Sequence, residues 1–184
     1  MVKVNFVSRI KQHIEDYLSE FVYGGIDGAV TTFAVVAGAT GANFSTKIIL
    51  VLGFANLIAD GFSMGVGSYL SSKSTLELKS KRKESIKNEP SPIINGLTTY
   101  ISFILIGFTP LMAYTVDYIL GQESQNVFIV AVLLTLLAFV GIGLLKSKVA
   151  HSHIPRAITE TVLLGAIAAS LAYLLGAFLE NIIT

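Results

Sequence analysis

The sequence contains no cysteine, which excludes disulfide bonds and metal sites built from thiolates. It also contains no tryptophan, so tyrosine, phenylalanine, lysine and arginine must supply any anchors at a membrane surface. Charged residues make up only 14% of the 184 residues, whereas a typical soluble domain has about a quarter. Hydrophobic residues make up 53%, and the mean hydropathy is +0.70. These features predict a protein that exposes much of its surface to lipid.

Five stretches are long and apolar enough to cross a bilayer as helices, which requires about 20 apolar residues each. Their polarity does not alternate, so helices rather than barrel strands must satisfy the backbone within the membrane. We therefore expect an all-α membrane protein with five transmembrane helices per protomer, the third bent at Pro110. The expected spans are Phe21–Ala42, Ile48–Leu70, Ile93–Val116, Val127–Leu145 and Ala157–Leu179.

Basic residues are distributed unevenly among the segments between these spans. The N-terminal segment, residues 71–92 and residues 146–156 hold 12 of the 13 lysines and arginines, and Lys47 is alone on the other side. Because basic loops stay in the cytosol, the N-terminus should be cytoplasmic and the C-terminus outside. The short chain and the absence of a targeting segment indicate a prokaryotic plasma membrane.

The N-terminal segment has a different pattern. Residues 1–20 are expected to form an amphipathic helix at the cytoplasmic interface, followed by a five-helix transmembrane domain over residues 21–184. The alternative is an ordinary soluble helix packed on the loops. The apolar positions that recur at helical spacing are Val4, Val7, Ile10, Ile14 and Leu18.

Two carboxylates lie inside expected spans, Asp27 in the first and Asp60 in the second. A carboxylate in hydrocarbon costs about 2.5–3.5 kcal/mol on insertion scales, so it usually faces a partner, a cavity or a substrate. Asn56, Asp60 and Met64 are each four residues apart and share one helix face. Depth counted from the basic side places Asp27 and Met64 at about one level, with Asp60 roughly 6 Å deeper.

The first helix carries its own row of acidic residues. Asp16, Glu20 and Asp27 share a face if the helix is continuous, and they would lead from the cytosol into the membrane. Carboxylate and amide oxygens beside a thioether favour first-row ions such as Fe²⁺ over Mg²⁺ or Ca²⁺. The carboxylates could also carry protons. Alternatively, each aspartate only bonds a neighbouring helix and Met64 only packs.

Glycines at a spacing of four allow helices to approach closely. Gly24 and Gly28 form one such pair, and Gly61 and Gly65 form another. They predict a homodimer whose metal path is lined by the first and second spans at the interface. In the alternative interpretation, the glycines serve packing within one protomer.

Four segments of the sequence resemble the vacuolar iron transporter family: residues 23–38, 55–72, 107–114 and 163–176. The resemblance implies a five-helix dimer that exports cytosolic Fe²⁺ or Mn²⁺ in exchange for protons. It assigns the transport site to Asp27 and Met64 and a cytoplasmic entrance role to Glu20 and Asp16. Asp60 and Asn56 fit its second-span motif.

Two departures from the family pattern accompany the resemblance. Well-studied members insert a glutamate-rich metal-binding domain between the second and third spans, and here only residues 71–92 are available. The position before Tyr69 is often acidic in the family, but it is Ser68 in this chain. The sequence therefore predicts a short form that lacks the cytosolic metal-binding insertion.

The predicted function is transport of a divalent metal, with the metal as cargo, protons as coupling ions and no bound cofactor. A non-transporting membrane scaffold, whose buried carboxylates only lock helices together, is the main alternative, and a carrier for an organic cation is a weaker one. The sequence has no phosphate-binding loop or nucleophile elbow, so we do not expect an enzyme. The basic loops follow from membrane orientation, so we expect no nucleic-acid partner.

Overall fold

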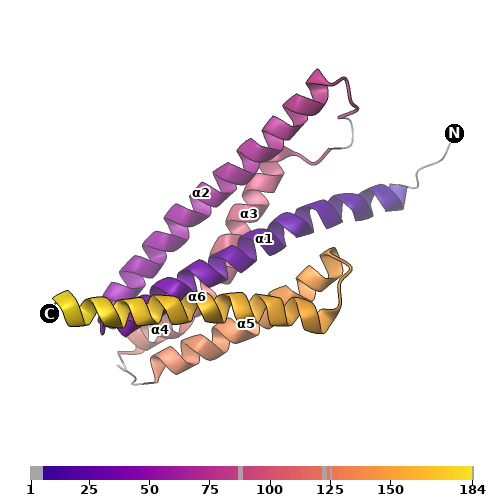
Figure 1. The fold of residues 1–184 in the computed structure, drawn as a ribbon. Helices are drawn as coiled ribbons and strands as arrows, with labels where there is room; N and C mark the ends of the chain where they lie inside the picture. Colours follow the sequence, from indigo (N-terminus) through magenta and orange to yellow (C-terminus); the bar gives the residue numbers. More distant parts are fainter. Residues whose placement is uncertain (1–5, 87–88, 122–123, 125, 184) are drawn as a thin grey trace.

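The computed structural model describes residues 6–86, 89–121, 124 and 126–183, and it describes side chains from Tyr17 onward. In Figure 1 the N-terminus and the α2–α3 and α5–α6 connections lie at one end of the helices, and the C-terminus lies at the other. We call the first end the basic end, because α2 and α5 finish there with Lys79, Lys81, Lys146 and Lys148. The helices are α1 (Phe6–Gly41), α2 (Thr46–Lys81), α3 (Pro92–Gly107), α4 (Thr109–Leu120), α5 (Val127–Val149) and α6 (Ile154–Ile183).

The helices confirm the prediction of an all-α membrane protein. Among the described residues, four helices are long and apolar enough to cross a membrane: α1 from Tyr17, α2, α5 and α6. The α3–α4 pair makes a fifth candidate span if the two helices are taken together, with a bend of 49° between them. This arrangement agrees with the five expected spans.

The bend between α3 and α4 lies next to Pro110. Proline has no backbone N–H and its ring clashes with the preceding turn, so it is tolerated only where a helix begins. The structure places Pro110 in the first turn of α4, directly after the break at Phe108. The sequence therefore identified the position of the bend correctly.

Helix α1 is the centre of the fold and packs against every other helix, most extensively α3 and α6. It runs without a break from Phe6 to Gly41, through the boundary expected after residue 20. The continuous helix places Glu20 and Asp27 on a single rod, as the acidic row required.

Helix α2 lies at the edge of the fold and is longer than expected. Its 36 residues correspond to roughly 54 Å, well beyond the roughly 30 Å of a hydrocarbon core. The expected span ended at Leu70, whereas the helix continues to Lys81. The Lys79 ammonium and the Glu89 carboxylate, 2.7 Å apart, then tie the end of α2 to the connection that leads to α3.

The glycine pairs have a different role from the one that the dimer prediction gave them. A Cβ atom on Gly24 or Gly28 would collide with the backbone of α3, at Thr99 and Phe103 respectively. A Cβ on Gly61 or Gly65 would press against Tyr100, also on α3. All four glycines therefore serve packing within one protomer, so they do not support a dimer.

Candidate metal-binding site

Helices α1 and α2 run antiparallel, and two hydrogen bonds between them fix their register. The Ser68 hydroxyl donates to the Glu20 carboxylate at 2.8 Å, nearer the basic end. Deeper in the bundle, the Asn56 amide donates to the Thr32 hydroxyl at 3.4 Å. The polar residues predicted from the sequence, Asp16 excepted, thus lie along one seam between these helices.

A cavity of about 380 Å³ opens between α1 and α2 near the basic end. It contains both Glu20 and Met64, so the structure brings the predicted entrance carboxylate and thioether to one space. Small polar side chains form most of the remaining wall, which makes the cavity suitable for water and a cation. The lining residues are Glu20, Tyr23, Ser63, Met64, Gly67, Ser68, Ser71 and Ser72.

Glu20 is half-buried, and hydroxyl groups from two other helices hold it in place. Besides Ser68 on α2, the Thr99 hydroxyl on α3 lies 2.9 Å from the same carboxylate oxygen as a donor. Sequence reasoning treated Ser68 only as a lost acidic ligand and missed Thr99 altogether.

Asp27 and Asp60 form the second feature of the seam. The two side chains are close enough to interact electrostatically. Asp27 is half-buried, while Asp60 is exposed. Two neighbouring carboxylates repel each other when both are ionised, so the pair is a candidate for binding a divalent cation.

In the observed register of α1 and α2, the residue opposite Asp27 differs by about one helical turn from the residue expected. Matching Glu20 with Ser68 and Thr32 with Asn56 places Asp60, rather than Met64, opposite Asp27. Met64 lies one turn nearer the basic end, in the cavity wall, where it also packs against the hydrophobic core. The depth count assumed that Phe21 and Leu70 lie at one level, whereas the two hydrogen bonds place Phe21 level with Gly67.

Within the described residues, no three His, Asp or Glu side chains are grouped so that they could hold a metal ion. At the level of the carboxylate pair, one protomer therefore offers Asp27 and Asp60. The Asn56 amide and the Met64 thioether lie at neighbouring levels. Divalent ions that prefer oxygen ligands take about six of them, so further ligands must come from water or from a second copy. The Asp16 side chain lies outside the described residues.

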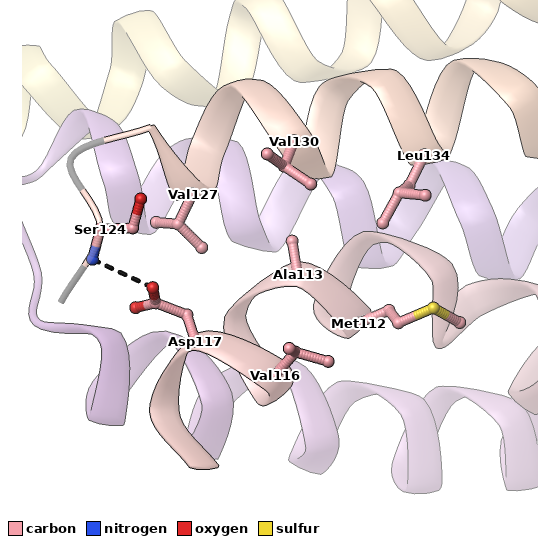
Figure 2. Close-up of a pocket in the computed structure, with 8 residues that line it drawn as sticks. All are labelled: Met112, Ala113, Val116, Asp117, Ser124, Val127, Val130 and Leu134. Carbon is pink, nitrogen blue, oxygen red and sulfur yellow. Dashed lines mark hydrogen bonds between the residues drawn. The ribbon is translucent and has the colours of Figure 1, made fainter. Parts of the chain in front are cut away.

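A further buried carboxylate, Asp117, lies at the opposite end of the fold and is only 7% exposed. Its carboxylate accepts a hydrogen bond of 3.0 Å from the Ser124 backbone N–H, as Figure 2 shows. Asp117 lines a second cavity, whose remaining wall is apolar, with Val116, Val127 and Val130 among its residues. Asp117 therefore orders the α4–α5 connection, and among the described residues it belongs to no group of three His, Asp or Glu side chains that could hold a metal ion.

Comparison with known proteins gives one consistent group of relatives. The model of the VIT family matches residues 18–89 and 76–177. A protein of Toxoplasma gondii called vacuolar iron transporter is 25% identical over 229 residues, covering 91% of this chain and 76% of the relative. Vacuolar iron transporter 1 of Arabidopsis thaliana is 26% identical, covering 90% and 87%, and vacuolar iron transporter of Centaurea cyanus is 26% identical, covering 91% of each.

The lengths of these alignments show that the relatives are longer than this chain in the aligned region. They span 222 to 229 residues although this chain has only 184, so the relatives carry insertions. The two matched segments of the family model overlap at residues 76–89, at the end of α2 and in the connection to α3. The family model thus matches the chain in two pieces that meet at this connection, where the sequence predicts a missing insertion.

Proposed function

The chain belongs to the VIT family, and we propose that it exports cytosolic Fe²⁺ or Mn²⁺ across the membrane in exchange for protons. Membership in the family supports metal transport by a multi-pass membrane protein. The direction, the ions and the coupling are the proposal. The observation that carries it is the seam between α1 and α2, where a carboxylate pair follows a polar cavity lined by Glu20 and Met64.

The carboxylate pair supports the exchange of metal for protons. When Asp27 and Asp60 are both ionised, they repel each other and attract a divalent cation. When the cation leaves, protons can take its place and keep the pair neutral within the membrane. The same two groups thus bind either cargo, which couples the two fluxes in opposite directions.

Met64 supports selection among divalent cations. Its thioether is a soft ligand in the wall of the cavity through which a cation would reach the carboxylates. Soft ligands favour Fe²⁺ over Mg²⁺ and Ca²⁺, which prefer oxygen alone. The absence of cysteine keeps binding weak enough for release on the far side.

Orientation and location complete the proposal. The basic end is assigned to the cytosol, because lysine- and arginine-rich loops remain there during insertion. The cavity with Glu20 would then receive cytosolic metal. We propose the plasma membrane of a prokaryote as the location, whereas the relatives are eukaryotic proteins named for the vacuole.

A flux assay in proteoliposomes tests metal transport and coupling together. With an acidic interior, we expect Fe²⁺ and Mn²⁺ to enter several times faster than without a pH gradient, while the interior becomes more alkaline. Vesicles without protein are the control, and Co²⁺ and Zn²⁺ test selectivity. Uptake that does not respond to the gradient would contradict antiport, and no uptake of any of the four ions would contradict metal transport.

The exposed face of α2 supports a homodimer that completes the site. Asp60 lies on this face beside a row of small exposed residues, although a lone carboxylate facing lipid is costly. A second copy packed there would remove Asp60 from lipid and could supply the missing ligands. The small exposed residues are Ala55, Ala59, Ser63 and Gly67.

Cross-linking tests the dimer directly, because the natural sequence has no cysteine. With Ala59→Cys, mild oxidation in the membrane should convert most of the protein to a covalent dimer, since the two copies of α2 would face each other. The matched control is Leu137→Cys, a position on α5 that is 68% exposed to lipid. Equal cross-linking of both variants would reject the interface.

A further inference from the structure

An apolar groove runs between α2 and α3 on the surface of the fold, separate from the polar seam. It encloses about 330 Å³. Each helix contributes four residues at the same helical spacing, so two matching ridges form the walls. The lining residues are Phe62, Gly65, Val66 and Tyr69 on α2, and Ile93, Gly96, Leu97 and Tyr100 on α3.

Two glycines form the floor of the apolar groove. A Cβ on Gly65 would lie 3.0 Å from the Gly96 carbonyl oxygen, and a Cβ on Gly96 would lie 2.6 Å from the Gly65 carbonyl oxygen. The backbones of α2 and α3 therefore touch at this point. The large side chains on either side of the contact cannot interdigitate and extend outward instead, which leaves a channel between them.

The walls of the apolar groove face outward from the fold. Phe62 on one wall is 64% exposed, and Ile93 on the other is 62% exposed. Water has almost no hydrogen-bonding partner in such a channel, so hydration is unfavourable. The remaining occupants are an acyl chain or a helix of a second copy.

The basic end of the apolar groove carries one cationic group. Lys73 lies one turn, roughly 6 Å, beyond Tyr69 on α2, and its ammonium is 6.0 Å from the centre of the Tyr69 ring. Lys73 makes no ion pair with the carboxylates of the part of the chain that the structure describes. A phosphate at the membrane surface would provide the missing counter-charge.

We propose that the apolar groove binds one acyl chain of an anionic phospholipid whose headgroup interacts with Lys73. The Lys73 ammonium at the basic end of the groove matches the anionic headgroup, and the apolar walls match the acyl chain. A second copy that covers Asp60 fits less well, because Asp60 and Phe62 are two residues apart and therefore point to different sides of α2. The lipid would thus pack against α2, the helix at the edge of the fold, and support it.

Native mass spectrometry of the full chain, released from micelles with phosphatidylglycerol or phosphatidylcholine, tests this inference. The wild-type protein should retain phosphatidylglycerol preferentially. Lys73→Gln should reduce that preference by about fivefold, the factor that one lysine contributes near an anionic membrane surface. The matched control is Lys148→Gln, an exposed lysine at the same end of the fold, which should leave the preference unchanged.

A second pair of variants tests the apolar groove itself. Leu97→Trp should fill the channel and reduce retention of both lipids, while Leu137→Trp on the exposed surface of α5 should not. If Leu97→Trp fails to fold, Val66→Trp fills the groove from the other wall. Unchanged retention in the groove variants would overturn the proposal, as would a change in dimer content without a change in bound lipid.

Discussion

Replacing Asp27 with asparagine should abolish metal uptake into proteoliposomes while leaving the protein folded. Asparagine keeps the size of the side chain but removes the charge that attracts a divalent cation and the group that accepts a proton. The loss should exceed the 10–100-fold that removal of an outer-shell partner alone costs a metal site. The measurement is initial uptake of Fe²⁺ and Mn²⁺ under an imposed pH gradient, together with thermal unfolding in detergent.

Asp117→Asn is the matched control for this substitution. Asp117 is also a buried carboxylate, but it lies at the other end of the fold and orders a connection through the Ser124 backbone. Asparagine retains an oxygen that can accept that hydrogen bond, so transport should continue. If Asp27→Asn instead raises stability and the wild-type protein binds no metal by calorimetry, the carboxylates only lock helices, as the scaffold alternative requires.

The membrane fold could be predicted from the sequence because it depends on quantities that are local in the chain. The length of each apolar stretch predicted a span, and Pro110 indicated the bend that separates α3 from α4. The end of α2 could not be predicted in the same way. Its last turns lie beyond the apolar stretch, and a contact with the connection that follows, between Lys79 and Glu89, holds its end.

The candidate site was only partly predictable, because helix spacing gives the face of a residue but not its partner. Spacing placed Asn56, Asp60 and Met64 on one face, and the structure puts all three along the seam with α1. The relative shift of the two helices depends on packing with α3, which the sequence does not reveal. This shift decides that Asp60, rather than Met64, lies opposite Asp27.

The roles of the glycines also depend on the position of α3, which their spacing in the sequence does not reveal. A pair separated by four residues allows close approach, but it does not say which helix approaches. Gly28 meets Phe103 and Gly107 of the same protomer, while the exposed Gly67 has open space around it. The dimer proposal therefore depends on exposure of small residues on α2, a property that appears only in the folded chain.

Gly28→Ala should cause a large loss of stability. The added methyl group would lie 2.9 Å from the Phe103 Cα atom, and its other near neighbours are also backbone atoms of Phe103. Backbone cannot rotate away as a side chain can, so α1 and α3 would have to separate. We expect the free energy of unfolding to fall by about 2–3 kcal/mol, which lowers the unfolding temperature by about 4–12 °C.

Gly141→Ala provides the matched control, because Gly141 also lies inside a helix but a Cβ there meets nothing within 4 Å. That substitution should be neutral or slightly stabilising, since alanine favours helix formation more than glycine does. Thermal unfolding followed by circular dichroism in the same detergent compares the two variants. Equal unfolding temperatures would mean that α1 and α3 are not in backbone contact at Gly28. The register that aligns Asp27 with Asp60 would then lose its support, because α3 packs against both α1 and α2.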